Sequence, residues 1–164
     1  MPFDLAAGAD WTAVGPGRVY SKRLIDELHR KARAKAPLVN GGVDGGVGTR
    51  VDLPRALRSR TFREFDDAFT APLHGFRDAD DYYAQSSSAP WLDRIAVPTC
   101  IVHALDDTFL PAGALPLAAL RSNPAIVAHV SAHGGHVGFV HGTPWAPTFF
   151  AEQTVARFLA EQFG

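Results

Sequence analysis

The clearest pattern of apolar and polar positions lies in the last third of the chain. Two short apolar runs, PTCIVHA (98–104) and AIVAHVSA (125–132), are typical of buried β-strands. The segment between them, AGALPLAALRS (112–122), is helix-like, and PTFFAEQTVARFLAEQF (147–163) predicts a terminal helix. A strand, a helix and a second strand in this order predict a parallel pair with a right-handed crossover.

Earlier segments follow the helical period instead. In VYSKRLIDELHRKARAK (19–35) the apolar residues share one face, and Ser21 is a candidate cap for the start of this helix. The opposite face carries six lysines and arginines, which favours a solvated surface over a site for an acidic ligand. DADDYYAQSSS (78–88) predicts a further short helix that ends before Pro90.

TFREFDDAF (61–69) opens with a capping-box pattern, from Thr61 to Glu64, and predicts a helix. Phe62, Phe65 and Phe69 fall on one stripe of that helix. Such a stripe is usually part of a core, and a share in lining an apolar substrate pocket is the alternative.

The two predicted strands are too few to form a stable parallel sheet. A two-stranded apolar parallel sheet is not stable by itself, and its first strand would expose an edge that is open to pairing. We therefore expect further strands from outside this chain. They would come from a separate amino-terminal half of the same fold or from self-association through that edge.

Composition narrows the possible classes. The 164 residues are 46% hydrophobic and 20% charged with a net charge of −1, which indicates a globular protein without a general affinity for nucleic acid. No apolar stretch is long enough to span a bilayer, so we expect no stable membrane insertion. The single cysteine, Cys100, fits a cytoplasmic location. The glycine-rich segment NGGVDGGVGTR (40–50) lacks the Gly-Lys-Ser/Thr ending of a phosphate-binding loop, which favours a flexible connection.

Candidate chemistry follows both predicted strands. Asp106 and Asp107 come after the first strand, and His133 and His136 come after the second. Because the carboxyl ends of adjacent parallel strands meet at one sheet edge, the two loops should lie close together. A carboxylate beside a histidine fixes its tautomer and stabilises the imidazolium that forms when the ring accepts a proton.

A metal site would need His129, His133 and His136 to converge. This segment runs from a strand into a glycine-rich loop, SAHGGHVGFVHG, which does not hold the three rings together, and no cysteine pair completes a ligand set. We therefore expect neither a metal nor a cofactor.

Four segments together are similar to the YheT-like family of α/β-hydrolases: SRTFREFDDAFTAPLHGF, DYYAQSSSAPWLDRI, PTCIVHALDDTFLP and HGGHVGF. The resemblance runs in order through nearly the whole chain. It implies hydrolysis of a small-molecule carboxylic ester through an acyl-enzyme, with a serine, an acid and a histidine as catalytic triad. The family's acid has a proline four residues later, which selects Asp107 with Pro111, and the family's histidine in Gly-Gly-His is His136.

The chain departs from that family at the nucleophile, because residues 1–164 contain no Gly-x-Ser-x-Gly elbow. We therefore expect one incomplete α/β-hydrolase domain that carries the acid and the base. A helical cap region would span about residues 1–92, and the last two parallel strands with their flanking helices would span about residues 93–164. By itself the chain should be inactive as a serine esterase. The alternative is a non-catalytic, truncated remnant or interaction module that pairs with a separate amino-terminal half.

Overall fold

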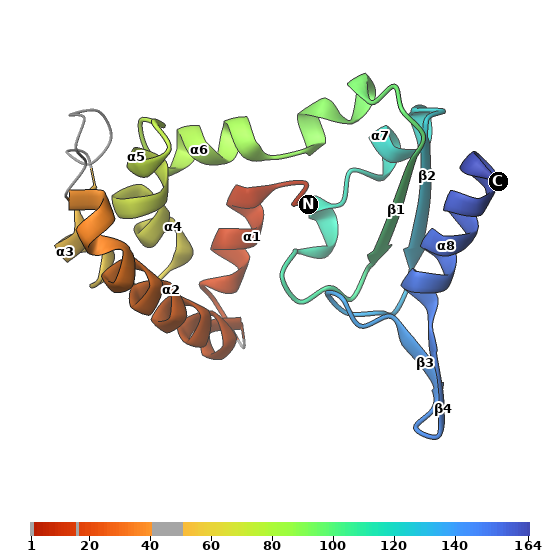
Figure 1. The fold of residues 1–164 in the computed structure, drawn as a ribbon, viewed down its shortest axis with the longest axis horizontal. Coiled ribbons are helices and arrows are strands. Elements are labelled where there is room, and N and C mark those ends of the chain that lie inside the picture. The colour runs from red at the N-terminus through yellow and green to blue at the C-terminus, as the bar shows by residue number, and fades with distance from the viewer. Residues whose placement is uncertain (1, 16, 41–50) are drawn as a thin grey trace. The chain divides into compact units, whose positions relative to one another are not determined.

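The structure is a computed structural model that describes residues 2–15, 17–40 and 51–164. The described chain divides into two compact units, residues 2–87 and residues 88–164 (Figure 1). The division thus falls a few residues before the boundary expected near residue 92. That both units belong to one α/β-hydrolase domain stays a prediction. The flexible connection predicted for the glycine-rich segment lies almost entirely outside the described residues.

All the regular secondary structure in the described part of the first unit is helical. Its helices are α1 (Leu5–Thr12), α2 (Gly17–Asn40), α3 (Leu53–Ala56), α4 (Phe62–Phe65), α5 (Ala71–Leu73) and α6 (Ala79–Ser86). A five-residue π-helical turn, Asp66–Thr70, joins α4 to α5. The helix predicted at 78–88 is therefore confirmed as α6, with Asp78 as its cap.

Helix α2 begins earlier than its sequence pattern indicated. Its first residue is Gly17, so the prediction that Ser21 caps the helix is wrong. Ser21 lies one turn inside α2, where its hydroxyl donates a hydrogen bond of 2.9 Å to the carbonyl of Thr12. This buried contact ties α2 to the end of α1, a long-range role that the helical period cannot reveal.

The capping box at Thr61 is confirmed. Its hydroxyl accepts from the backbone N–H of Glu64, and the Glu64 carboxylate accepts from the backbone N–H of Thr61. The predicted helix does not continue regularly, however, because the backbone N–H of Ala71 bonds the carbonyl of Asp66 in π-helical register. The next residue, Pro72, has no N–H to donate and could not extend an α-helical ladder.

The three phenylalanines of the predicted stripe divide between two clusters. Phe65 and Phe69 are buried in one core together with Ala32 and Ala56. Phe62 packs instead against the cluster formed by Ala9, Ala79 and Tyr83. Their share in a substrate pocket stays a prediction.

A partly buried carboxylate makes the stability of this unit depend on pH. The Tyr83 hydroxyl donates a hydrogen bond of 2.7 Å to Asp66, and burial raises the pKa of that aspartate above its ordinary value. A carboxyl group with a raised native pKa binds its proton more tightly in the folded state. Its contribution to stability is therefore present below the ordinary aspartate pKa and is lost as pH rises through the raised value.

We expect Asp66→Asn to flatten this part of the pH dependence. Urea unfolding followed by circular dichroism between about pH 3.5 and 7 measures the change. The wild type should lose more stability than Asp66→Asn as pH rises, whereas the exposed Asp93→Asn should follow the wild type. Parallel curves for the wild type and Asp66→Asn would contradict the expectation.

The second unit is built on two strands, β1 (Thr99–Ala104) and β2 (Ile126–Ser131), which pair in parallel with Val102 opposite His129 (Figure 1). Both predicted strands and their parallel pairing are confirmed. Helix α7 (Leu117–Ser122) lies between them in sequence and contacts β2, and α8 (Phe150–Phe163) contacts β1. Two 3₁₀ turns, Ala89–Arg94 and Ala112–Ala114, complete the helical elements of this unit. The unit is compatible with part of an α/β fold.

A hairpin replaces the start of the predicted terminal helix. Strands β3 (Val140–Thr143) and β4 (Ala146–Phe149) pair in antiparallel fashion, and α8 begins only at Phe150. Gly142 has a φ of +92°, and a Cβ there would lie 2.5 Å from the carbonyl oxygen of Ala146. The turn thus requires a glycine. The helical spacing of apolar residues after residue 147 gave no sign of this hairpin.

Strand β1 pairs only with β2 among the described residues. The N–H groups of Thr99 and Leu105 donate to Ala125 and Ser131, so the odd-numbered positions of β1 face β2. By the alternation of a strand, Cys100 and Val102 present their backbone groups to the other edge. That edge is the one from which the sequence predicts further pairing.

Candidate acid–histidine site

The site is formed by the loops that follow β1 and β2. The parallel pairing brings the ends of both strands, Ala104 and Ser131, to the same edge of the sheet. Asp106 and Asp107 follow the first strand, and His133 and His136 follow the second. The structure thereby brings together the four side chains that the sequence predicted to be neighbours.

Asp107 and His136 form a direct pair. The Nδ1 atom of His136 lies 3.0 Å from Oδ2 and 3.2 Å from Oδ1 of Asp107. The Asp107 side chain is 4% exposed, whereas the His136 side chain is 50% exposed. A carboxylate only accepts hydrogen bonds, so Nδ1 is the donor, and the neutral ring keeps its lone pair on Nε2. No hydrogen bond within the described residues occupies that Nε2 atom.

Phe109 holds both members of this pair. Its backbone N–H donates a hydrogen bond of 2.8 Å to Oδ1 of Asp107. Its ring lies 4.4 Å from the imidazole of His136, measured between centroids, at an interplanar angle of 40°. Phe109 is not among the residues that the sequence patterns indicated. Its position two residues after Asp107 could have predicted this contact, because the backbone N–H at that position readily reaches an aspartate side chain.

The neighbouring carboxylate, Asp106, supports the loop rather than the ring of His136. It accepts a hydrogen bond of 2.8 Å from the backbone N–H of Gly135, and its Oδ2 lies 3.4 Å from Nδ1 of His133. The bond from Gly135 is the largest cause of the lowered pKa of Asp106. Asp106 therefore anchors the residue that directly precedes His136.

This anchor gives a testable expectation. Asp106→Ala removes the acceptor of Gly135, so the exchange of the Gly135 amide proton should become about tenfold faster because the loop opens more often. Asp106→Asn keeps a side-chain oxygen in reach and should restore most of the protection. Hydrogen exchange followed by NMR measures both variants. Equal protection in the wild type and Asp106→Ala would show that other contacts hold the turn.

The turn before His136 is tightly packed. Gly135 has a φ of +62°, which glycine adopts at little cost. A Cβ on Gly134 would lie 2.6 Å from the Phe139 ring, so this position has no room for a side chain. Phe139 itself has a φ of +44°, and its N–H bonds the carbonyl of Gly134. A strained residue and two glycines thus fix the path of the backbone around His136.

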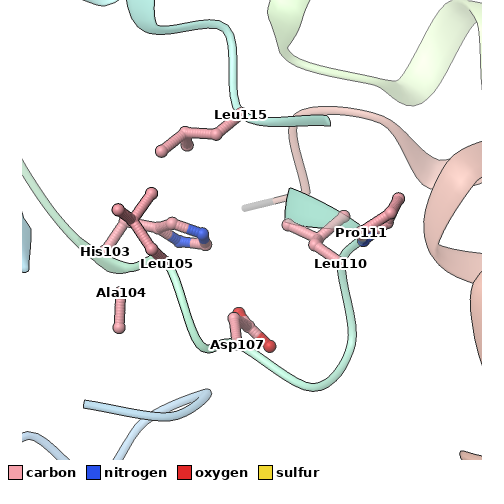
Figure 2. A pocket seen from close by; sticks show the side chains of 7 residues that line it. All are labelled: His103, Ala104, Leu105, Asp107, Leu110, Pro111 and Leu115. Atoms are coloured by element: carbon pink, nitrogen blue, oxygen red, sulfur yellow. The ribbon is translucent and has the colours of Figure 1, made fainter. Parts of the chain in front are cut away.

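A small hollow adjoins Asp107 (Figure 2). The His103 ring lies on one side of it, and Leu110 and Pro111 lie on the other. Burial lowers the pKa of His103, although the nearby Asp107 carboxylate partly opposes that effect. The hollow has a volume of about 10 Å³, barely the size of one water probe, so it is too small to hold an ester.

The remaining histidines of this unit lie apart from the pair. The ring of His129, on β2, makes an edge contact with Phe150, and His141 lies on the exposed strand β3. Among the described residues no three side chains of histidine, cysteine, aspartate or glutamate are arranged to hold a metal ion. In the same part of the chain, no helix combines the length and apolarity that crossing a bilayer requires.

Comparison with known proteins agrees with the resemblance seen in the sequence. The chain is 37% identical over 158 residues to the protein named "Putative esterase YheT" of Escherichia coli (strain K12), a match that covers 96% of this chain. The chain belongs to the YheT-like family of α/β-hydrolases. It is also 32% identical over 140 residues to the monoacylglycerol lipase of Saccharomyces cerevisiae. Its identity to human phospholipase ABHD3 is 33% over 93 residues.

These matches cover only part of each relative. The YheT-like chain spans 44% of the length of the Escherichia coli protein. It covers 30% of the yeast lipase and 23% of human phospholipase ABHD3, while the matched shares of this chain are 84% and 57%. No family model and no solved structure matches the chain.

Proposed function

We propose that this YheT-like chain supplies the acid and the base of a carboxylic-ester hydrolase. Asp107 is the acid, His136 is the general base, and a serine outside these 164 residues is the nucleophile. The observation that carries the proposal is the buried Asp107 carboxylate bonded to Nδ1 of His136, whose Nε2 has no partner among the described residues. Relatives named as an esterase, a phospholipase and a monoacylglycerol lipase support the same reaction class.

In the proposed reaction His136 transfers one proton in each of the two halves, acylation and deacylation. Its Nε2 accepts the serine proton as the serine oxygen attacks the ester carbonyl, and Asp107 stabilises the imidazolium. Nε2 then gives the proton to the leaving alcohol as the tetrahedral intermediate collapses to an acyl-enzyme. A water molecule, deprotonated by Nε2, attacks the acyl carbon, and return of that proton to the serine releases the carboxylic acid.

A serine inside the described chain is a poor alternative nucleophile. Ser59 contacts a histidine, with Oγ 2.9 Å from Nε2 of His29. The Ser59 hydroxyl, however, gives its only proton to the carbonyl of Ala56 at 2.7 Å, so His29 must be the donor and cannot act as its base. Burial raises the pKa of the Cys100 thiol, which disfavours a cysteine nucleophile as well.

The proposal also includes the missing part of the sheet. Strands β1 and β2 keep most of their side chains partly accessible, and Val127 is 44% exposed. Parallel strands of complete α/β proteins are normally covered on both faces. We propose that the free edge of β1 pairs with strands of an amino-terminal half that also carries the serine elbow and the oxyanion hole. Self-association through this edge is the alternative.

The test begins with the coding DNA upstream of the Met1 codon. We expect it to encode a Gly-x-Ser-x-Gly elbow, in frame or one frameshift away. The extended protein, which joins that sequence to this chain, should hydrolyse short-chain nitrophenyl esters, whereas the purified chain alone should not.

Two results would overturn the proposal. Turnover by the chain alone that disappears in His136→Ala would show that no external nucleophile is needed. An unrelated upstream sequence, together with a monomeric chain that melts cooperatively, would favour a non-catalytic module.

A further inference from the structure

A cavity in the first unit carries an excess of positive charge that the hydrolase proposal does not use. It has a volume of about 330 Å³ and lies between the start of α2 and the segment Ser59–Thr61 that precedes α4. Three cationic side chains, Arg18, Lys22 and Arg60, line it against a single carboxylate, Asp26. This volume falls in the range of sites for small organic molecules.

The floor of the cavity is buried and offers no free reactive group. Ile25 lines it but is 2% exposed, so it offers a ligand only a small apolar contact. The hydroxyls of Ser21 and Ser59 also lie on the floor, but they donate to backbone carbonyls of Thr12 and Ala56. The cavity is therefore suited to binding rather than to nucleophilic chemistry.

The cations on the rim are largely free to bind a ligand. Lys22 pairs with Asp26 at 3.0 Å, but these side chains are 77% and 60% exposed, and such a pair is weak and easily exchanged. Within the described part of the chain no carboxylate pairs with the side chain of Arg18 or Arg60. Two guanidinium groups from different segments can therefore approach one oxyanion, for which their planar donors are well matched.

The start of α2 adds a second attraction for an anion. The cavity is lined by residues of the first three turns of this 24-residue helix, and its first turn contains no acidic side chain. The partial positive charge at the amino end of α2 is thus not neutralised from within the helix. Helix dipole and rim cations act in the same direction.

We propose that this cavity binds a phosphate monoester, with the phosphate on Arg18, Arg60 and Lys22 and a short apolar or glycerol-like portion over Ile25. The segment 19–35 alone favours a solvated basic face. Of the basic residues in that segment only Lys22 lines the cavity, where the structure adds Arg18, which precedes the segment, and Arg60 from a separate one. The site is independent of the acid–histidine pair in the second unit.

Binding of glycerol 3-phosphate to the full chain, followed by calorimetry or NMR, tests the proposal. Arg18→Gln and Arg60→Gln should each weaken binding about tenfold, because each removes a charge-assisted hydrogen bond. Arg23→Gln is the matched control: it removes an exposed arginine from the same helix that does not line the cavity, and it should bind like the wild type.

A second arm identifies the source of the phosphate. Vesicles of phosphatidylcholine with phosphatidic acid present the same headgroup on a lipid surface, and vesicles of phosphatidylcholine alone are their control. Binding of glycerol 3-phosphate supports a soluble ligand. Binding of the phosphatidic acid vesicles alone, with the same arginine dependence, supports a lipid headgroup. Absence of both kinds of binding, or equal weakening by Arg23→Gln, would overturn the site.

Discussion

His136→Ala should reduce kcat of the extended protein at least about ten-thousand-fold on a nitrophenyl ester. The imidazole is proposed to pass the serine proton to the leaving alcohol during acylation and the water proton to the serine during deacylation. Both halves of the reaction therefore lose their proton carrier. Alanine also leaves the Asp107 carboxylate, which is 4% exposed, with the Phe109 N–H but without its imidazole partner. Initial rates at saturating ester concentration measure the loss.

His133→Ala is the control for this variant. His133 lies three residues earlier on the same loop, and its side chain is 91% exposed. Its replacement should change kcat by less than about fivefold, because surface side chains away from the reacting atoms have small effects. Comparable losses in both variants would show that the loop as a whole, rather than the His136 ring, determines activity. Full activity in His136→Ala would refute its assignment as base.

Asp107→Asn should lower kcat of the extended protein by about a thousand- to ten-thousand-fold. The carboxylate accepts the Nδ1 proton of His136 and leaves Nε2 free to act as base. An asparagine amide can instead donate to Nδ1, which moves the proton of the neutral ring to Nε2. The ring would then hold its proton on the atom that should accept one, and the imidazolium would lose its buried counter-charge.

The tautomer can be measured separately from the activity. In this chain labelled with ¹⁵N-histidine, NMR should show the Nδ1–H form of His136 in the wild type and a shift toward the Nε2–H form in Asp107→Asn. Asp106→Asn is the matched control, because Asp106 bonds the Gly135 backbone and contacts His133 rather than His136. A large loss of kcat in Asp106→Asn but not in Asp107→Asn would mean that the acid has been assigned to the wrong aspartate.

Local sequence patterns predicted the elements that depend on short-range physics. The apolar runs at 98–104 and 125–132 became β1 and β2, and the capping box at Thr61 formed as expected. Patterns failed where distant or backbone-specific contacts decide the outcome. Ser21 does not cap α2 because the helix begins at Gly17, and the Ser21 hydroxyl bonds Thr12 instead. The β3–β4 hairpin depends on the positive φ of Gly142.

The sequence by itself determined which residues could form the candidate site. It placed two aspartates and two histidines after parallel strands, and its resemblance to YheT-like hydrolases favoured Asp107 and His136. It also showed that no serine elbow is present in residues 1–164. The positions of these residues and the missing elbow need only residue types, their order and their spacing, whereas the choice of Asp107 and His136 rests on the resemblance.

Only the tertiary structure decided how the two adjacent aspartates divide their contacts. Asp107 is buried and bonds the His136 ring, whereas Asp106 is exposed and bonds the Gly135 backbone. Neighbouring residues in a turn direct their side chains differently, and which one reaches a partner 29 residues away depends on the packing of both loops. The cavity at the start of α2 also depends on the packing of distant segments, because it requires the Ser59–Thr61 segment beside Arg18 and Lys22.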